Sequence, residues 1–302
     1  MIDFQGMWTL QGELFLLMAL GFLFRRRNLA GEAFQKGLAE VVIDLVLPCN
    51  IICSFQTPVN GQTLRQTGSI LLASLAIQLG CWLLAKVAFR RCEAAKRPSL
   101  QYGTICSNAG FLGTPLAEGL FGAQGALLAA IYLIPQRIAM WSLGISFFTQ
   151  VEGRAFWKKT VTHPCLIAAG AGVVIMTAQI RLPPILDQTI HALGSCNTAL
   201  SMFLIGMIMS KLRWRDFLDR DTLCFTVVRL AVIPALVLLG CRLAGMGGLS
   251  EAVAVLLAAM PAGGTTAIVA AKYGGDAEFA AGCVTVSTVL SLIAIPLWCL
   301  AF

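Results

Sequence analysis

The chain has 302 residues, of which 58% are hydrophobic and only 12% are charged, and its mean hydropathy is +0.80. Soluble domains contain about 45–50% apolar and about 25% charged residues, so this composition excludes an ordinary soluble protein and predicts an integral membrane protein. The net charge of +7 would suit a nucleic-acid partner, but the placement of the basic residues accounts for it without one.

Apolar runs between charged residues predict about ten transmembrane helices. A span needs roughly 20 apolar residues to cross about 30 Å of hydrocarbon, so ten spans leave only short loops. None of the runs alternates between apolar and polar residues as a barrel strand does. In chain order, the predicted spans are 5–24, 37–55, 67–89, 100–121, 125–149, 163–180, 186–210, 222–245, 249–271 and 277–301.

The basic residues fall on one side of these spans. Seventeen of the 22 Lys and Arg residues follow odd-numbered spans, whereas the other connections and the termini hold only Arg65, Arg181 and Arg242. Cytoplasmic loops of membrane proteins carry an excess of Lys and Arg. We therefore expect a multi-pass protein of the cell membrane with both termini on the non-cytoplasmic side.

Two similar segments, half a chain apart, predict an internal repeat. Residues 107–115 in the fourth span and 260–266 in the ninth combine Gly, Pro and small polar residues, and each precedes an apolar stretch that ends in an aromatic–Gly pair. If each repeat holds five spans, the second copy enters the membrane from the opposite side. The sequence therefore predicts an all-α membrane protein of two inverted five-helix repeats, 1–152 and 153–302.

Gly and Pro in the middle of a membrane interrupt the helical hydrogen-bond ladder, and the freed groups need a cavity or protein partners. We expect helices four and nine to be broken and to cross at a binding site, although ordinary kinks are the alternative. The amino-terminal ends of their second halves would direct amides toward an anion. The candidate binding residues are Asn108, Gly110, Gly113, Thr114, Pro115, Pro261, Gly263, Gly264, Thr265 and Thr266.

Several motifs resemble the auxin efflux carrier family along the whole chain. They are Asn108-Ala-Gly-Phe-Leu-Gly-Thr-Pro-Leu116, Met260-Pro-Ala-Gly-Gly-Thr-Thr266, Ala271-Lys-Tyr-Gly-Gly-Asp276, Ile295-Pro-Leu-Trp298 and Leu47-Pro-Cys-Asn-Ile51. The resemblance implies the fold of bile-acid symporters and sodium/proton antiporters, with a scaffold of spans 1, 2, 6 and 7 and a mobile part of spans 3–5 and 8–10. It also implies transport of organic anions, such as auxin-like acids, malate or malonate. The short central segment 150–163 favours the bacterial permeases of the family over its plant members.

Ionisable residues within spans are costly and indicate a function or a buried partner. The planar fork of Arg137 suits a carboxylate, and an ion pair with Glu118 is the structural alternative. Asp44 is a candidate for proton or sodium coupling, whereas Glu40 lies near the basic end of its span. Arg229 is expected to pack internally or to extend toward the headgroups.

These features predict a secondary transporter of small organic anions that works by alternating access at the helix crossover, with no cofactor. A sodium- or proton-coupled cation exchanger that uses intramembrane acids is the alternative. The chain has no HExxH, GxSxG or nucleotide-binding loop, so no motif predicts an enzyme, a metal site or an ATP-driven pump. The expected partners are the anion and the lipid bilayer, and the fold is compatible with a homodimer through the scaffold helices.

Overall fold

The structure is a computed structural model that describes residues 4–56, 61–148, 162, 164–210 and 219–301. All of its named elements in this part of the chain are helical. Eight helical segments here are apolar, and six of them are long enough to cross a membrane. These six are Glu32–Phe55, Gly61–Ala88, Ala109–Ala139, Pro184–Met209, Arg220–Leu243 and Ala277–Cys299, and the two shorter ones are Pro164–Ala178 and Leu249–Ala258. The chain is therefore an all-α membrane protein.

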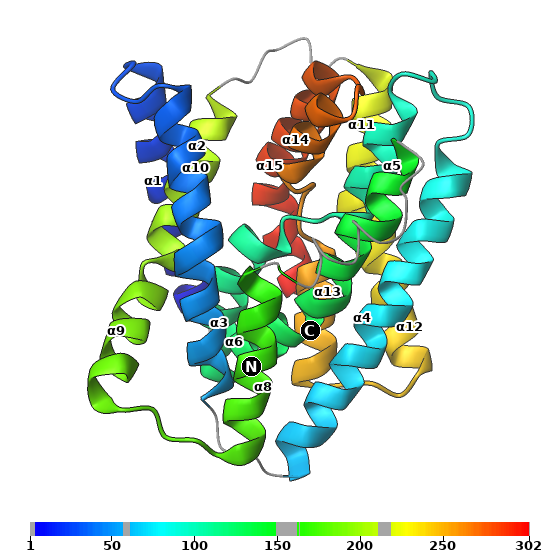
Figure 1. The fold of residues 1–302 in the computed structure, drawn as a ribbon. Helices are drawn as coiled ribbons and strands as arrows, with labels where there is room; N and C mark the ends of the chain where they lie inside the picture. The colour runs from blue at the N-terminus through cyan, green and yellow to red at the C-terminus, as the bar shows by residue number, and fades with distance from the viewer. Residues whose placement is uncertain (1–3, 57–60, 149–161, 163, 211–218, 302) are drawn as a thin grey trace.

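One group of helices forms around the amino-terminal part of the chain. In it, α1 packs along α10, and α3 packs against α8 and α9. Figure 1 shows α1, α2, α9 and α10 at one side of the molecule. The members of this group are α1 (Phe4–Arg26), α2 (Glu32–Val41), the π-helical turn η1 (Val42–Val46), α3 (Leu47–Phe55), α8 (Pro164–Ala178), α9 (Pro184–Ser195) and α10 (Asn197–Met209).

The remaining helices form a second group, in which α4 packs on α5 and α6, α13 on α6 and α12, and α15 on α11 and α14. Figure 1 shows α4, α5 and α12 at the side opposite to α1. The members are α4 (Gly61–Ala88), α5 (Arg97–Ile105), η2 (Ala109–Gly113), α6 (Thr114–Ala139), η3 (Met140–Gly144), η4 (Ile145–Phe147), α11 (Arg220–Val227), η6 (Val228–Val232), α12 (Ile233–Leu243), α13 (Leu249–Ala258), α14 (Thr265–Lys272) and α15 (Ala277–Cys299).

Helix α6 consists of two segments that turn back on each other at Gly122. This glycine has φ +65° and ψ −155°, a conformation that L side chains rarely adopt. A Cβ added to Gly125 would meet the carbonyl of Ala117, although eight residues of a straight helix span about 12 Å. The chain therefore reverses here, between the predicted fourth and fifth spans.

A π-helical turn precedes Pro48, Pro115 and Pro234, one in each of three long segments. In each case, the residue before the proline donates its N–H to the carbonyl five residues earlier. A proline ring clashes with the carbonyl four residues before it, and the wider π turn accommodates the ring without ending the helix. The prolines therefore determine where these helices are distorted.

The closest helix packing in the described part involves two glycines at the contact of α1 with α10. A Cβ on Gly21 would overlap the backbone carbonyl of Phe203, and a Cβ on Gly206 would overlap that of Met18. Small residues allow membrane helices to approach closely, and packing then stabilises the pair. Each of the two helices thus places a glycine against a backbone carbonyl of the other, which allows the close contact.

We expect Gly21→Ala to lower the melting temperature of the detergent-solubilised protein. Alanine favours a helix by about 1 kcal/mol over glycine, but overpacking costs about 1–3 kcal/mol. Gly12→Ala is the matched control, because a Cβ on Gly12 in the same helix meets no atom within 4 Å. Equal melting temperatures for the two variants, measured by thermal unfolding, would contradict the packing interpretation.

Candidate functional site

The two interrupted helices, α5–η2 and α13–α14, meet at their breaks. The Asn108 N–H donates to the Pro261 carbonyl at 2.7 Å, and the Gly263 N–H donates to the Cys106 carbonyl at 2.8 Å. These bonds form an isolated antiparallel bridge between the two breaks. Backbone groups that leave one helical ladder are thus satisfied by the other broken helix, as a low-dielectric environment requires.

Side chains from neighbouring helices satisfy other backbone groups of the breaks. Gln136 on α6 donates its Nε2 to the Ser107 carbonyl at 2.8 Å, and the Ser107 hydroxyl donates to Gln136 Oε1 at 2.9 Å. On the other break, the Ala262 N–H donates to the hydroxyl oxygen of Ser287 on α15 at 3.2 Å. The crossing is therefore fixed from two sides by α6 and α15.

Arg229 lies at the carboxyl-terminal ends of both first half-helices and is only 2% exposed. Its Nε donates to the Met260 carbonyl at 2.9 Å, its Nη2 to Ala258 at 3.0 Å and its Nη1 to Thr104 at 3.3 Å. The expected internal packing is therefore observed, and the side chain does not extend toward the headgroups. The sequence singled out this arginine only by its cost in a membrane, because its partners are backbone carbonyls that carry no sequence signal.

A cavity of about 100 Å³ lies where the second half-helices begin, and Arg229 does not line it. It is lined by residues from both breaks, from α6, from the α2–α3 segment and from α8, and none of the described lining residues is acidic. The predicted site residues that line it are Asn108, Gly110, Arg137, Gly263, Gly264 and Thr265, and Ser107 and Gln136 also contribute. Ser107 is not among the binding residues that the sequence predicted.

Arg137 gives this cavity its charge. The side chain is 6% exposed, and its Nη1 has no hydrogen-bond partner among the described residues. No salt bridge joins it to Glu118 in the described part of the chain; Glu118 instead accepts a hydrogen bond from Asn50 Nδ2 at 3.3 Å. The amino-terminal ends of η2 and α14 at the same cavity add positive dipole ends. A bound anion would therefore meet complementary charge and a free donor.

Five predicted residues lie outside the cavity lining. Gly113 packs on α13, the Thr114 hydroxyl donates to the Ala109 carbonyl at 3.3 Å, and Thr266 is fully buried. The other two are the prolines: Pro115 is the second residue of α6, and the Pro261 carbonyl takes part in the bridge. These residues shape the crossing rather than the cavity surface.

Asp44, the candidate coupling group, lies in η1, and its side chain is exposed. Its neighbour Ile43 lines the cavity, but Asp44 itself does not. Glu40 is also exposed, one helical turn away. The structure thus brings Arg137, and neither of these two acids, to the crossing.

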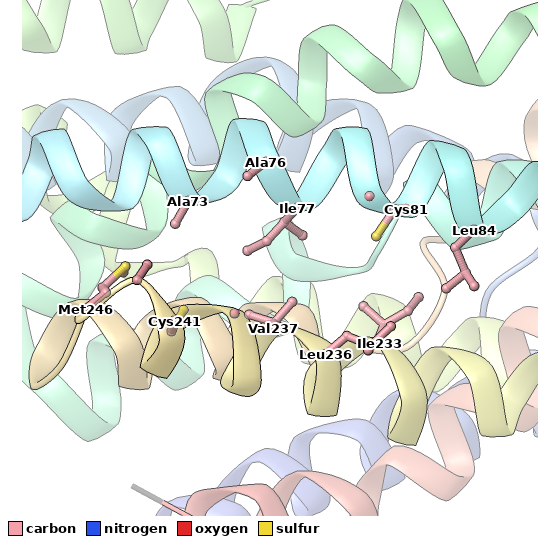
Figure 2. A pocket seen from close by; sticks show the side chains of 13 residues that line it. Ala73, Ala76, Ile77, Cys81, Leu84, Ile233, Leu236, Val237, Cys241 and Met246 are labelled. Carbon is pink, nitrogen blue, oxygen red and sulfur yellow. The ribbon is translucent and has the colours of Figure 1, made fainter.

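A larger cavity, of about 300 Å³, lies between α4 and α12. Figure 2 shows Ile77 and Leu84 on one helix and Ile233 and Val237 on the other, with their side chains directed into the space between the helices. None of the described residues that line it is charged. This apolar cavity therefore offers nothing that would hold a small anion.

Comparison with known proteins identifies the family. The sequence matches the membrane transport protein family over residues 12–155 and 152–299. The chain belongs to this family. Its similarity extends to an uncharacterized transporter of Methanothermobacter thermautotrophicus, with 26% identity over 94% of each chain, and to one of Methanocaldococcus jannaschii, with 24% identity over 94% of each chain.

The resemblance to auxin efflux carriers is confirmed as well. A probable auxin efflux carrier component of Oryza sativa subsp. japonica is 28% identical over 150 residues, which are 46% of this chain and 39% of the rice protein. The membrane transport protein described here therefore shares its family with transporters from archaea and plants.

The hydrogen bond from the Ala262 N–H to the Ser287 hydroxyl should contribute measurably to the stability of this membrane transport protein. We expect Ser287→Ala to lower the melting temperature, because an unpaired buried N–H costs about 1–3 kcal/mol. Ser291→Ala is the control: Ser291 lies one turn further on α15, is equally buried, and donates only to the Thr288 carbonyl of its own helix. A loss no larger for Ser287→Ala than for Ser291→Ala in thermal unfolding would contradict this role.

Proposed function

We propose that this membrane transport protein is a secondary carrier of small organic anions and that the anion binds in the cavity at the crossing. The unpaired, buried Nη1 of Arg137 is the observation that carries the proposal. A buried charge without a partner is costly, and a bound carboxylate would offset that cost with charge-assisted hydrogen bonds. Asn108 and Thr265 add polar groups at the same cavity.

The charge and the size of the cavity favour an anion over a cation. Two helix amino termini supply about half a positive charge each, in addition to the guanidinium, and none of the described residues that line the cavity is acidic. A volume of about 100 Å³ corresponds to only a few water molecules at ~30 Å³ each. We infer that a compact carboxylate group binds here. The cation exchanger has no comparable support, because neither Asp44 nor Glu40 reaches this cavity.

We also propose how the carrier moves. Two inverted repeats of five spans, divided near residue 152, would each supply one broken helix to the crossing. The helices of the first group (α1–α3 and α8–α10) would form the scaffold. Those of the second group would move with the anion and expose it to each side in turn. Both termini would be non-cytoplasmic, Asp44 would be the candidate for proton or sodium coupling, and two copies would associate through the scaffold.

The test is uptake of labelled mono- and dicarboxylates into proteoliposomes. We expect saturable uptake by the wild type and at least about a tenfold loss in Arg137→Gln, because a charge-assisted hydrogen bond contributes ~1.5–3 kcal/mol. Arg137→Lys should retain part of the activity, since it keeps the charge. Asn108→Ala should weaken uptake less, because it removes a polar group but no charge.

Arg65→Gln is the control for loss of a positive charge, because Arg65 is an exposed residue of α4 outside the cavity. We expect Arg137→Gln to melt at the same temperature as the wild type or higher, since it removes an uncompensated buried charge. Saturable uptake that survives Arg137→Gln would remove the site from this cavity. A complete lack of uptake across the acid panel, with imposed proton and sodium gradients, would refute the carrier.

A further inference from the structure

We propose that Arg229 is a tethered cation that takes the place of a coupling ion at the crossing. This positioning residue is almost completely buried, and its three nitrogens donate to three backbone carbonyls. The Ala258 carbonyl belongs to the last residue of α13, the Met260 carbonyl lies two residues beyond it, and the Thr104 carbonyl belongs to the last turn of α5. A single side chain thus binds the carboxyl ends of both interrupted helices.

The electrostatics of the two ends match this single charge. A helix carboxyl terminus carries about half a negative charge, so the two ends together present roughly one. A guanidinium stays protonated in proteins and supplies one positive charge. No salt bridge to Arg229 occurs among the described residues, so the balance rests on the helix ends and their carbonyls.

In carriers with discontinuous helices, unwound carbonyls and half-helix carboxyl ends are where a sodium ion or proton is coordinated. In this chain, the guanidinium already occupies such a cluster of carbonyls. Its fixed fork also determines the relative position of the two helices, which a mobile ion would do only while bound. The helix ends are therefore neutralised whether or not a metal cation is present outside.

The transport consequence, which rests on the proposed carrier function, is that the carrier needs no sodium, so any coupling through Asp44 would be to protons. Anion uptake by the wild type should be equal when choline replaces sodium on both sides of the membrane. Arg229 and Arg137 then have separate tasks at different ends of the interrupted helices. The first holds the carboxyl ends permanently, and the second meets the anion at the amino ends.

The stability test needs no substrate. The full-length protein in detergent is unfolded thermally in sodium chloride, choline chloride or dilute guanidinium chloride at matched ionic strength. We expect the wild type to melt at the same temperature in sodium and choline. Arg229→Ala should melt about 5 °C lower or more. Guanidinium or sodium, but not choline, should restore part of that loss by entering the vacated carbonyl cluster.

Arg65→Ala, at an exposed residue of α4, is the control for a general effect of salt on an arginine variant, and its melting temperature should not depend on which cation is present. If Arg229→Ala does not fold, Arg229→Lys and Arg229→Gln decide the question. Lysine keeps the charge, whereas glutamine keeps only hydrogen-bond donors. A melting temperature higher for Arg229→Lys than for Arg229→Gln therefore supports the tethered cation. An equal or lower one overturns it.

Two further results would also overturn the inference. One is a higher melting temperature of the wild type in sodium chloride than in choline chloride. The other is a melting temperature of Arg229→Ala that is no higher in sodium or guanidinium chloride than in choline chloride. Failure of the carrier itself would be seen separately, as a lack of acid uptake with these melting temperatures unchanged. Conversely, acid uptake that requires sodium would refute the tethered cation and leave the carrier intact.

Discussion

A backbone that leaves its helix in the middle of a bilayer has to satisfy its N–H and C=O groups within the protein. At the crossing of α5–η2 with α13–α14, each break meets this requirement with the other, through the bonds from Asn108 to Pro261 and from Gly263 to Cys106. Neither break could be satisfied in this way without the other. The two halves of the chain are therefore joined at this point, and the helices that surround it, α6 and α15, supply the side chains that complete the pairing.

The crossing also keeps the carboxyl ends of the first half-helices, which carry partial negative charge, apart from the positive amino ends of the second half-helices. The carboxyl ends of the first half-helices face Arg229, whose three nitrogens each donate to a backbone carbonyl there. The amino ends of the second half-helices face Arg137, which has an unpaired nitrogen. Both arginines are almost fully buried, yet each nitrogen of Arg229 has an acceptor among the described residues, whereas Nη1 of Arg137 has none. This difference in hydrogen bonding, rather than a difference in burial, distinguishes a structural arginine from one that is available to an anion.

The sequence predicted the helical membrane architecture and the positions of both breaks, because Gly and Pro act on the backbone wherever they stand. It also indicated that Arg137 needs a cavity or a partner. It did not identify the partners of Arg229, which are backbone carbonyls from two distant segments, nor the pairing of Gln136 with Ser107. Glu118 looked like a partner of Arg137 in the sequence, but it contacts Asn50 instead. Side-chain pairings across long separations depend on packing angles, which local patterns do not determine.

The unpaired nitrogen of Arg137 lowers the stability of the folded protein. A neutral residue of similar size would avoid a buried, uncompensated charge, and proteins commonly sacrifice stability at sites that bind a ligand. Gln136, the adjacent residue, shows the alternative, because its amide is satisfied as both donor and acceptor by Ser107. The chain thus places a saturated polar residue next to an unsaturated charged one in the same cavity wall. The first fixes the wall, and the second has a nitrogen left over for the small anion that we propose to bind in the cavity.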